Sequence, residues 1–240
     1  MALLRTFKSI YYSIFPKPVR RFIHTVYPFS LVSKHLKTWL VMRAPHDEVY
    51  DARYFEDAID PAATAAAPMI VASLMRELGP ASVVDVGCGT GAILLEFQAR
   101  GVKVLGLERA PAAIEILKGR KIDFLPFDVE RDCTIPFKAD LVMSTEVAEH
   151  LPEALADRFV ELLSRISDKL AFTAATPGQG GTDHLNEQPV EYWIEKFERK
   201  GLIFQEELTL RLRNEWRQAG IAHYYAENLI VMMRPPGAAV

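Results

Sequence analysis

Val83-Val84-Asp85-Val86-Gly87-Cys88-Gly89-Thr90-Gly91 is the stretch of sequence that decides the fold. Its β-branched apolar residues predict a strand, its three alternate glycines predict a tight turn, and 92–100 predicts a helix directly afterwards. Glycine suits this turn because it adopts unusual backbone angles and has no side chain to hold a ligand away from the main chain. A dinucleotide fingerprint has its third glycine one residue later. The G-x-G-x-G spacing therefore indicates another kind of ligand loop, which the following strands must identify.

Three further strands are predicted after this loop, and each ends in an acidic residue. The strand 102–107 leads into Glu108, which is placed where a carboxylate could accept both hydroxyls of a ribose. The strand 123–127 leads into Asp128, which is suitably placed to receive an adenine amino group. A fourth strand, 140–146, ends in Glu146. This order of strands and acids indicates a site for a nucleoside-containing ligand.

At this point the sequence resembles the class I S-adenosylmethionine (SAM)-dependent methyltransferases, over about residues 81–201. The resemblance implies an α/β fold with a doubly wound, seven-stranded, mostly parallel, Rossmann-like sheet, and SAM as cofactor. A nucleotide-binding dehydrogenase of similar strand order is the alternative, and the glycine spacing speaks against it. The cofactor-binding residues that the resemblance implies are Asp85, Gly87, Cys88, Gly89, Gly91, Glu108, Arg109, Asp128, Val129, Thr145 and Glu146.

Strands and helices alternate along the rest of the chain, as a doubly wound sheet requires. Helices are predicted over 61–78, 110–120, 152–167 and 190–200, and a fifth strand over 169–176. The segments 203–208 and 228–233 are interpreted as a closing pair of strands, antiparallel in the resembled family. Between them, 211–227 is longer than a hairpin needs, and we expect it to form part of the acceptor pocket. Two domains are expected: a helical N-terminal extension, 1–60, and a methyltransferase domain, 61–240.

Charge is distributed unevenly along the 240 residues. The first 46 residues contain eight Lys or Arg and no acid, whereas the whole chain has 28 Lys and Arg against 31 Asp and Glu. Residues 1–44 also interleave these charges with aromatic and aliphatic side chains. They are interpreted either as an amphipathic segment at an anionic membrane surface or as a lid or dimer contact. A nucleic-acid patch is a third alternative.

Two cysteines give little reason to propose a disulfide, and no apolar run is long enough to span a membrane. The N-terminus also lacks the uninterrupted apolar region of a secretory signal. We therefore expect a cytoplasmic protein, with peripheral contact at the inner membrane face through residues 1–44.

A cluster of acidic and imidazole groups is predicted at the carboxyl edge of the sheet. Glu146, Glu149 and His150 follow the fourth strand, and in a helical turn residues three and four apart share a face. The loop after the fifth strand contains Asp183 and His184 and opens at the same edge. Two carboxylates and two imidazoles there predict a divalent metal site with Glu146, Glu149, His150 and His184 as ligands.

This Glu-x-x-Glu-His set followed by a later His resembles the metal site of small-RNA 3′-terminal 2′-O-methyltransferases. A similar Glu-x-x-Glu-His is found in ubiquinone-biosynthesis O-methyltransferases. The RNA enzymes have a histidine-rich approach to their last ligand, whereas here His184 lies among glycines, which disfavours RNA as acceptor. Mixed oxygen and nitrogen ligands suit Mn²⁺, Fe²⁺ or Zn²⁺, while Mg²⁺ usually prefers oxygens. The metal-free alternative makes His184 a general base with Asp183 as its partner.

We therefore expect a SAM-dependent O-methyltransferase that acts on a sugar, a glycan or another small diol or catechol. The catalytic residues would be His184, His150, Glu149 and Asp183. RNA 2′-O-methylation is the second hypothesis, and the acidic catalytic portion speaks against it. A SAM-binding scaffold without catalysis is the third. The aromatic and imidazole side chains expected at the acceptor are Tyr54, Trp193, Trp216, His223 and Tyr224.

Overall fold

The computed structural model describes residues 50–132, 135–136 and 138–237. These residues form one compact unit that begins at Tyr50. The predicted extension lies outside the described residues up to position 49, so its helices, its membrane role and the predicted boundary at residue 60 stay predictions. No helix of the described part of the chain is long and apolar enough to cross a membrane.

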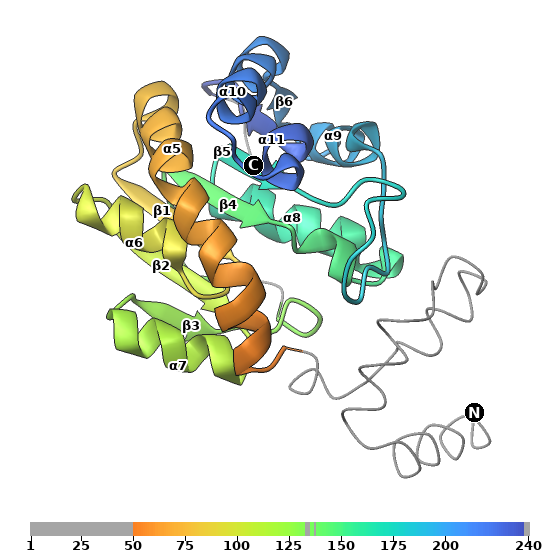
Figure 1. The fold of residues 1–240 in the computed structure, drawn as a ribbon. Helices are drawn as coiled ribbons and strands as arrows, with labels where there is room; N and C mark the ends of the chain where they lie inside the picture. The colour runs from red at the N-terminus through yellow and green to blue at the C-terminus, as the bar shows by residue number, and fades with distance from the viewer. Residues whose placement is uncertain (1–49, 133–134, 137, 238–240) are drawn as a thin grey trace, which may run out of the picture. The chain divides into compact units, whose positions relative to one another are not determined.

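A seven-stranded sheet in the order β3-β2-β1-β4-β5-β7-β6 forms the centre of the unit (Figure 1). The first five strands in the chain pair in parallel, and β7 is antiparallel to both β5 and β6. This confirms the predicted Rossmann-like fold and its antiparallel closing pair. The strands are β1 (Ser82–Val86), β2 (Lys103–Glu108), β3 (Phe124–Pro126), β4 (Leu141–Thr145), β5 (Lys169–Thr173), β6 (Ile203–Phe204) and β7 (Ile230–Met233).

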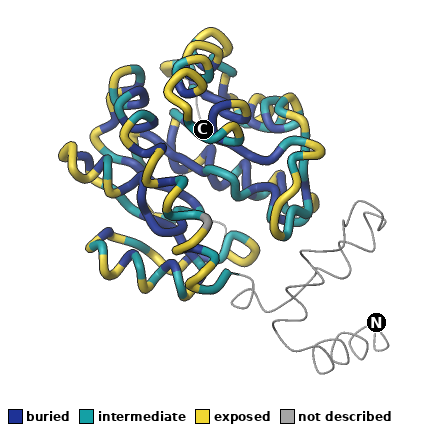
Figure 2. The backbone as a smooth tube through the Cα atoms, in the orientation of Figure 1, coloured by how far each residue is buried: buried dark blue, intermediate teal, exposed yellow. Residues whose placement is uncertain are grey.

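Helices cover both faces of the sheet, and the two resulting cores contain most of the buried large apolar side chains of the described residues. One core contains Ile70, Leu74, Phe97 and Trp216, and the other contains Phe159, Leu163, Trp193 and Phe197. Buried strands between partly exposed helices are visible in Figure 2. The helices are α5 (Asp60–Leu78), α6 (Ala92–Ala99), α7 (Pro111–Arg120), α8 (Ala156–Ile166), α9 (Val190–Glu198), α10 (Glu206–Gln218) and α11 (His223–Asn228).

The segment between β6 and β7 differs from the prediction. The predicted strand 203–208 ends at Phe204, because Glu206 begins α10, and the supposed insert 211–227 consists largely of α10 and α11. Acidic residues in the first turn of α10 suit a helix N-terminus. The Trp216 indole donates to the Ser73 hydroxyl of α5 at 2.8 Å, so α10 packs on the sheet as part of the core.

A π-helix, η2 (Tyr54–Ile59), leads directly into α5. Residues 50–59, called the strap below, carry Tyr50, Tyr54 and Phe55. These side chains pack with Ala110 and Ala113 at the start of α7, in a small apolar cluster of their own. π-Helical turns are uncommon and occur often at functional sites. The strap therefore lies where β1 and β2 deliver the glycine loop and Glu108.

Candidate active site

The glycine loop is held in a conformation that other residues would adopt only with strain. Gly91 has φ +73°, and a Cβ there would lie 2.6 Å from side-chain atoms of Leu117 and Ile122. The Gly87 N–H donates to the Leu107 carbonyl at 2.8 Å, which ties the loop to the end of β2. Only glycine meets both the backbone angle and the close approach of α7. The need for glycine in the predicted turn is thus explained by the contact of the loop with Leu117 and Ile122.

Glu108 is a buried carboxylate whose hydrogen bonds come from backbone N–H groups. It is 8% exposed and accepts from the N–H groups of Gly89, Arg109 and Ala110 at 2.7–2.8 Å. Burial raises the pKa of Glu108, and the three donors act in the opposite direction. The carboxylate is therefore fixed at the carboxyl end of β2, beside the glycine loop.

Asp85 lies near the end of β1, just before the glycine loop, and one of its carboxylate oxygens has no partner among the described residues. It is 2% exposed, and Oδ1 has no hydrogen-bond partner among the described residues. Burial, with the nearby charge of Glu108, raises the pKa of Asp85 to about 7. A buried acceptor without a donor is unfavourable unless a ligand supplies one. An ammonium group, such as that of the methionine part of SAM, would satisfy this oxygen, so the loop fits the cofactor.

Two residues outside the loop, Asp60 and Arg120, bind Thr90 within it. The Asp60 carboxylate accepts from the Thr90 hydroxyl at 2.6 Å and from the Arg120 guanidinium at 2.7 Å. Arg120 also donates to the Thr90 carbonyl at 3.0 Å. This latch, formed by Asp60, Thr90 and Arg120, joins α5, the loop and the end of α7. No sequence signal marked Asp60 or Arg120, because their pairing depends on the tertiary fold.

At the end of the site where adenine is predicted to bind, the acidic side chains form ion pairs with Arg109. The Arg109 guanidinium lies 3.2 Å from Asp128 and 3.3 Å from Glu130, and Asp128 also accepts from the Glu130 N–H. Val129 packs against the core beneath α8, and Thr145 ends β4. Cys88 is half-buried, and the desolvation of its thiol raises the pKa of that group. The cofactor contacts assigned to these residues stay predictions.

The strap connects the cofactor loop with the acceptor end of the site. Phe55 lies over Gly89, where a Cβ would be 3.6 Å from its ring. Phe55 contacts Tyr54 edge to face, and Tyr54 contacts Tyr50 likewise at 5.0 Å between ring centroids. Burial, with the charges of Glu149 and Asp183, raises the pKa of Tyr54 to about 12. The predicted site residue Tyr54 is thus brought to the site as a neutral phenol.

Three of the four predicted metal ligands come together at the carboxyl ends of β4 and β5. Glu149, His150 and His184 each offer a ligand atom, and these atoms lie within 4.8 Å of one another. The two imidazole rings are 5.0 Å apart and nearly perpendicular. Glu149 is fully buried, and neither of its carboxylate oxygens has a hydrogen-bond partner among the described residues. Burial and the charge of Glu146 raise its pKa well above the ordinary value.

Each histidine of this triad is oriented through Nδ1. His184 Nδ1 lies 3.0 Å from the Glu187 carboxylate, which also accepts from the N–H groups of Gly178 and Gly180. His150 Nδ1 lies 3.1 Å from the Tyr50 hydroxyl. Such outer partners fix the orientation of ligand histidines in metal sites. Sequence reasoning missed both partners, although the spacing of His184 and Glu187 along one loop was a usable signal for the second.

Glu146 lies outside the triad. It adopts a left-handed backbone conformation, with φ +53°, and the short helical turn after β4 contains only Ala148–His150. The predicted shared helical face therefore does not include Glu146. Its oxygens accept from Gln179 Nε2 at 2.8 Å and from Asn228 Nδ2 at 3.2 Å. The structure thus brings three of the four predicted ligands together, and the role of Glu146 as a fourth ligand stays a prediction.

Asp183 is the second acidic residue of the site with positive φ, at +58°. Only three non-glycine residues of the described chain have positive φ, and two of them, Glu146 and Asp183, lie at this site. Strained backbone of this kind is concentrated at functional sites. Burial raises the pKa of Asp183 to about 6. This carboxyl can therefore take up or release a proton near neutral pH.

The predicted acceptor residues divide into two groups. Trp193 and Trp216 are 1% and 2% exposed and belong to the two cores, so they have no free ring face for an acceptor. This is a correction, and its cause is that α9 and α10 pack directly on the sheet. His223 is exposed and Tyr224 half-buried, and their rings are 5.5 Å apart. Burial and the charge of Glu146 raise the pKa of Tyr224, which places it near the site.

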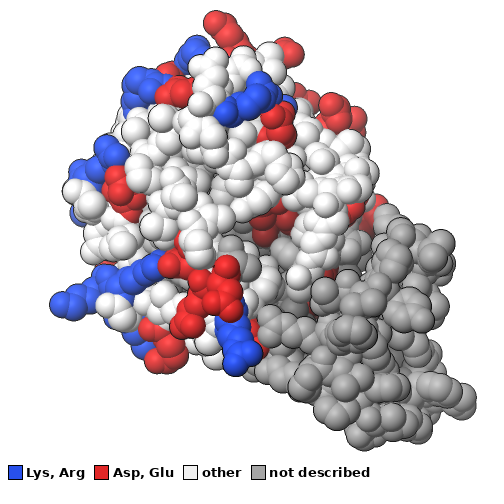
Figure 3. All heavy atoms as spheres, in the orientation of Figure 1, with Lys and Arg blue, Asp and Glu red and all other residues white. Residues whose placement is uncertain are grey.

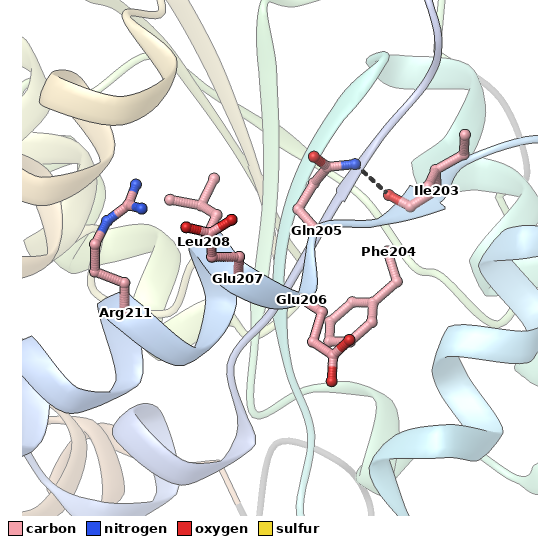
Figure 4. A pocket seen from close by; sticks show the side chains of 7 residues that line it. All are labelled: Ile203, Phe204, Gln205, Glu206, Glu207, Leu208 and Arg211. Carbon is pink, nitrogen blue, oxygen red and sulfur yellow. Dashed lines mark hydrogen bonds between the residues drawn. The ribbon is translucent and has the colours of Figure 1, made fainter.

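A separate hollow of about 380 Å³ lies at the start of α10 (Figure 4). It is lined by residues of β6 and α10, including Phe204, Glu207 and Arg211, and it contains no predicted site residue. On the face drawn in Figure 3, acidic and basic side chains of the described residues are interspersed, without a continuous basic surface. Neither the hollow nor the face drawn in Figure 3 indicates a binding site for a nucleic acid or another charged polymer.

Comparison with known proteins agrees with this geometry. A family model described as a methyltransferase domain matches residues 32–220. A ubiquinone biosynthesis O-methyltransferase of Methylobacterium sp. (strain 4-46) is 32% identical over 78 residues, which is 30% of this chain and 31% of the relative. The chain thus aligns with about a third of the length of this curated relative.

Two solved structures share the fold at low sequence identity. An O-methyltransferase family protein from Burkholderia thailandensis has a TM-score of 0.60 and 16% identity, over 85% of this chain and 69% of that one. Magnesium protoporphyrin IX methyltransferase from Synechocystis PCC 6803, with bound SAM, has a TM-score of 0.56 and 14% identity, over 91% and 97%. The chain therefore belongs to the methyltransferase-domain family and carries a SAM-dependent methyltransferase domain.

Proposed function

We propose that the protein is a SAM-dependent O-methyltransferase, assisted by a divalent metal, that methylates a hydroxyl of a small diol such as a sugar, a glycan or a catechol. The observation that carries this proposal is Glu149, a fully buried carboxylate that has no hydrogen-bond donor among the described residues, beside two oriented imidazoles. An uncompensated buried charge is strongly unfavourable, and a cation would satisfy it. The triad would hold the cation through Glu149, His150 and His184.

Methyl transfer breaks the sulfur–methyl bond of the sulfonium and forms an oxygen–methyl bond, and the hydroxyl proton must leave. The chain's main task is to hold both reactants in line. A divalent cation at the triad would polarise the acceptor hydroxyl and lower the pKa of its proton. Asp183, whose pKa is raised to about 6, is the side chain of the site suited to receive that proton near neutral pH.

An oxygen acceptor is supported by the curated relatives, both of which are ubiquinone biosynthesis O-methyltransferases. A diol is favoured because two vicinal oxygens can share one cation. Half-buried Tyr54 and Tyr224 offer ring surfaces beside the triad for a sugar or an aromatic ring. RNA is disfavoured as acceptor, because the catalytic portion is acidic overall and RNA binding normally uses a basic surface.

The metal-free alternative assigns the proton to His184, oriented by Glu187, with Asp183 nearby. The deciding experiment measures methyl-donor consumption over a panel of sugars and catechols, before and after EDTA treatment, together with metal analysis of the purified protein. We expect EDTA to abolish turnover, Mn²⁺ or another divalent ion to restore it, and His184→Ala and Glu149→Ala to lose this response. Full turnover in excess EDTA by metal-free protein would leave the general-base mechanism.

Membrane association is a separate proposal that concerns residues 1–44. Their eight basic and many aromatic side chains favour contact with anionic lipid, which would bring the enzyme to membrane-bound precursors. Flotation with anionic liposomes, with and without residues 1–44, tests it. Equal flotation of both forms would remove the membrane role.

A further inference from the structure

The strap contacts both halves of the site. At one end, Phe55 lies over Gly89, whose N–H group donates to Glu108 in the cofactor-binding half. At the other end, the Tyr50 hydroxyl lies 3.1 Å from His150 Nδ1 in the triad. Between them, the rings of Tyr50, Tyr54 and Phe55 contact one another edge to face, at 5.0 and 5.3 Å. One short segment thus reaches from the cofactor loop to a proposed metal ligand.

The two histidines of the triad differ in how they are oriented. The partner of His184 is Glu187, three residues away on the same loop and fixed by two further backbone N–H groups. One partner of His150 is Tyr50, one hundred residues earlier in the chain. The orientation of His184 is therefore local, whereas that of His150 depends on the position of the strap.

We propose that Tyr50 is a positioning residue that couples SAM binding to divalent-cation binding. Cofactor bound beside Glu108 and the glycine loop would contact the strap and favour its position over Gly89. In this position Tyr50 meets His150 Nδ1, so His150 presents Nε2 toward the cation. Each ligand then strengthens the binding of the other by the same factor, because linkage between binding sites is reciprocal. The inference rests on the proposed metal site.

The test uses Mn²⁺ and S-adenosylhomocysteine (SAH), the demethylated cofactor, with the full chain. Mn²⁺ dissociation constants are measured by titration calorimetry with and without saturating SAH. In the wild type we expect SAH to tighten Mn²⁺ binding by about fivefold or more, which lies within the usual range of coupling. In Tyr50→Phe, which keeps the ring and loses the hydroxyl, the two constants should agree within about twofold.

Two further variants separate coupling from damage to the fold. Phe55→Leu, at the other end of the strap, should reduce the coupling while Tyr50 remains. Tyr192→Phe, on α9, is the matched control and should keep the wild-type factor, since Tyr192 contacts Lys196 and Trp193 away from the strap.

Each outcome has a distinct meaning. Mn²⁺ binding that SAH does not alter in the wild type would overturn the coupling and leave the metal site standing. Full coupling in Tyr50→Phe would overturn the role of Tyr50. Failure of the wild type to bind Mn²⁺ with or without SAH would remove the triad as a metal site, and the coupling with it, while SAH binding would still report the cofactor site.

Discussion

Glu108 ends β2 and Glu149 lies in the turn after β4. Both glutamates are buried, and they are stabilised in opposite ways. Glu108 accepts three backbone N–H groups, whereas neither oxygen of Glu149 has a donor among the described residues. The cofactor half of the site therefore has its carboxylate satisfied by the fold itself. The acceptor half has a carboxylate that needs a proton or a cation. The contrast shows which part of the site is completed by folding and which depends on a ligand.

The largest effects are expected when each of the two glutamates is replaced by glutamine, because these substitutions should change the free energy of unfolding in opposite directions. Glu149→Gln should lower turnover by about 100-fold or more, since metal affinity depends even on partners of the ligands. It should also raise the free energy of unfolding of the metal-free protein near pH 7 by about 1–3 kcal/mol, because burial raises the pKa of the Glu149 carboxyl, which must take up a proton on folding, whereas an amide need not. Glu108→Gln should lower that free energy by a similar amount, since it loses charge-assisted bonds.

Urea unfolding in EDTA measures both free energies, and SAH production in the acceptor screen measures turnover. A loss of stability in Glu149→Gln equal to that in Glu108→Gln would contradict the comparison, because it would mean that Glu149 is already satisfied.

Asp85 is a third buried acid of the site, and it should make the free energy of unfolding depend on pH. Its pKa is about 7 in the folded state and about 3.9 when exposed, so the folded protein retains a proton that the unfolded chain has released. Stability without ligands should therefore fall as pH rises from about 4 to 7. Because asparagine does not titrate, Asp85→Asn should make this decrease in the free energy of unfolding smaller by an amount on the order of 2–4 kcal/mol. Unfolding curves of the wild type and of Asp85→Asn at pH 5 and pH 8 check this prediction. An equal change in the free energy of unfolding of the two proteins between these pH values would refute it.

Glu187 tests whether the triad depends on its outer partner. Glu187→Gln removes the charge that orients His184 and should weaken Mn²⁺ binding by about tenfold. Glu195→Gln, on the exposed face of α9, is the matched control. Calorimetric titration of both variants with Mn²⁺ provides the measurement. Unchanged affinity in Glu187→Gln would show that the loop alone positions His184.

The contacts of the latch, formed by Asp60, Thr90 and Arg120, test whether the outside of the glycine loop affects SAM affinity. We expect this effect to be the smallest of those predicted here. Arg120→Met breaks a partly exposed ion pair with Asp60 and the bond to the Thr90 carbonyl. SAM binding should weaken by about fivefold, near 1 kcal/mol. Arg100→Met, which removes the surface pair with Glu96, should leave SAM affinity as it is. If both variants bind SAM equally well, the latch has no role in cofactor binding.

The fold was predictable because its signals are local. The glycine loop, the strands before Glu108 and Asp128, and the glycine after α9 mark the alternation along the chain. The prediction failed between β6 and β7, where a strand was expected over 203–208 and an acceptor-pocket insert over 211–227, because α10 and α11 occupy most of this segment. Trp216 instead fills a core whose other side is α5, and no local pattern reports a partner some 140 residues away.

The candidate site was predictable in its residue types and less so in its geometry. Glu149, His150 and His184 follow two neighbouring parallel strands, whose carboxyl ends share one edge of the sheet. Their proximity could therefore be predicted. The left-handed turn at Glu146 could not be foreseen, because the sequence there reads equally well as a regular helix. Tyr50, Glu187 and Asp60 were missed because each acts through one specific tertiary or loop contact.

The last strand of the chain lies inside the sheet rather than at its edge. β7 inserts between β5 and β6, and Asn228, immediately before it, donates to Glu146. During synthesis, β5 must therefore remain without its outer neighbour until more than fifty further residues have been made. Contacts so distant in sequence form slowly. We expect the acceptor half of the site to be assembled late in folding, which makes β7 the segment whose mutation would most prolong a state with an exposed strand edge.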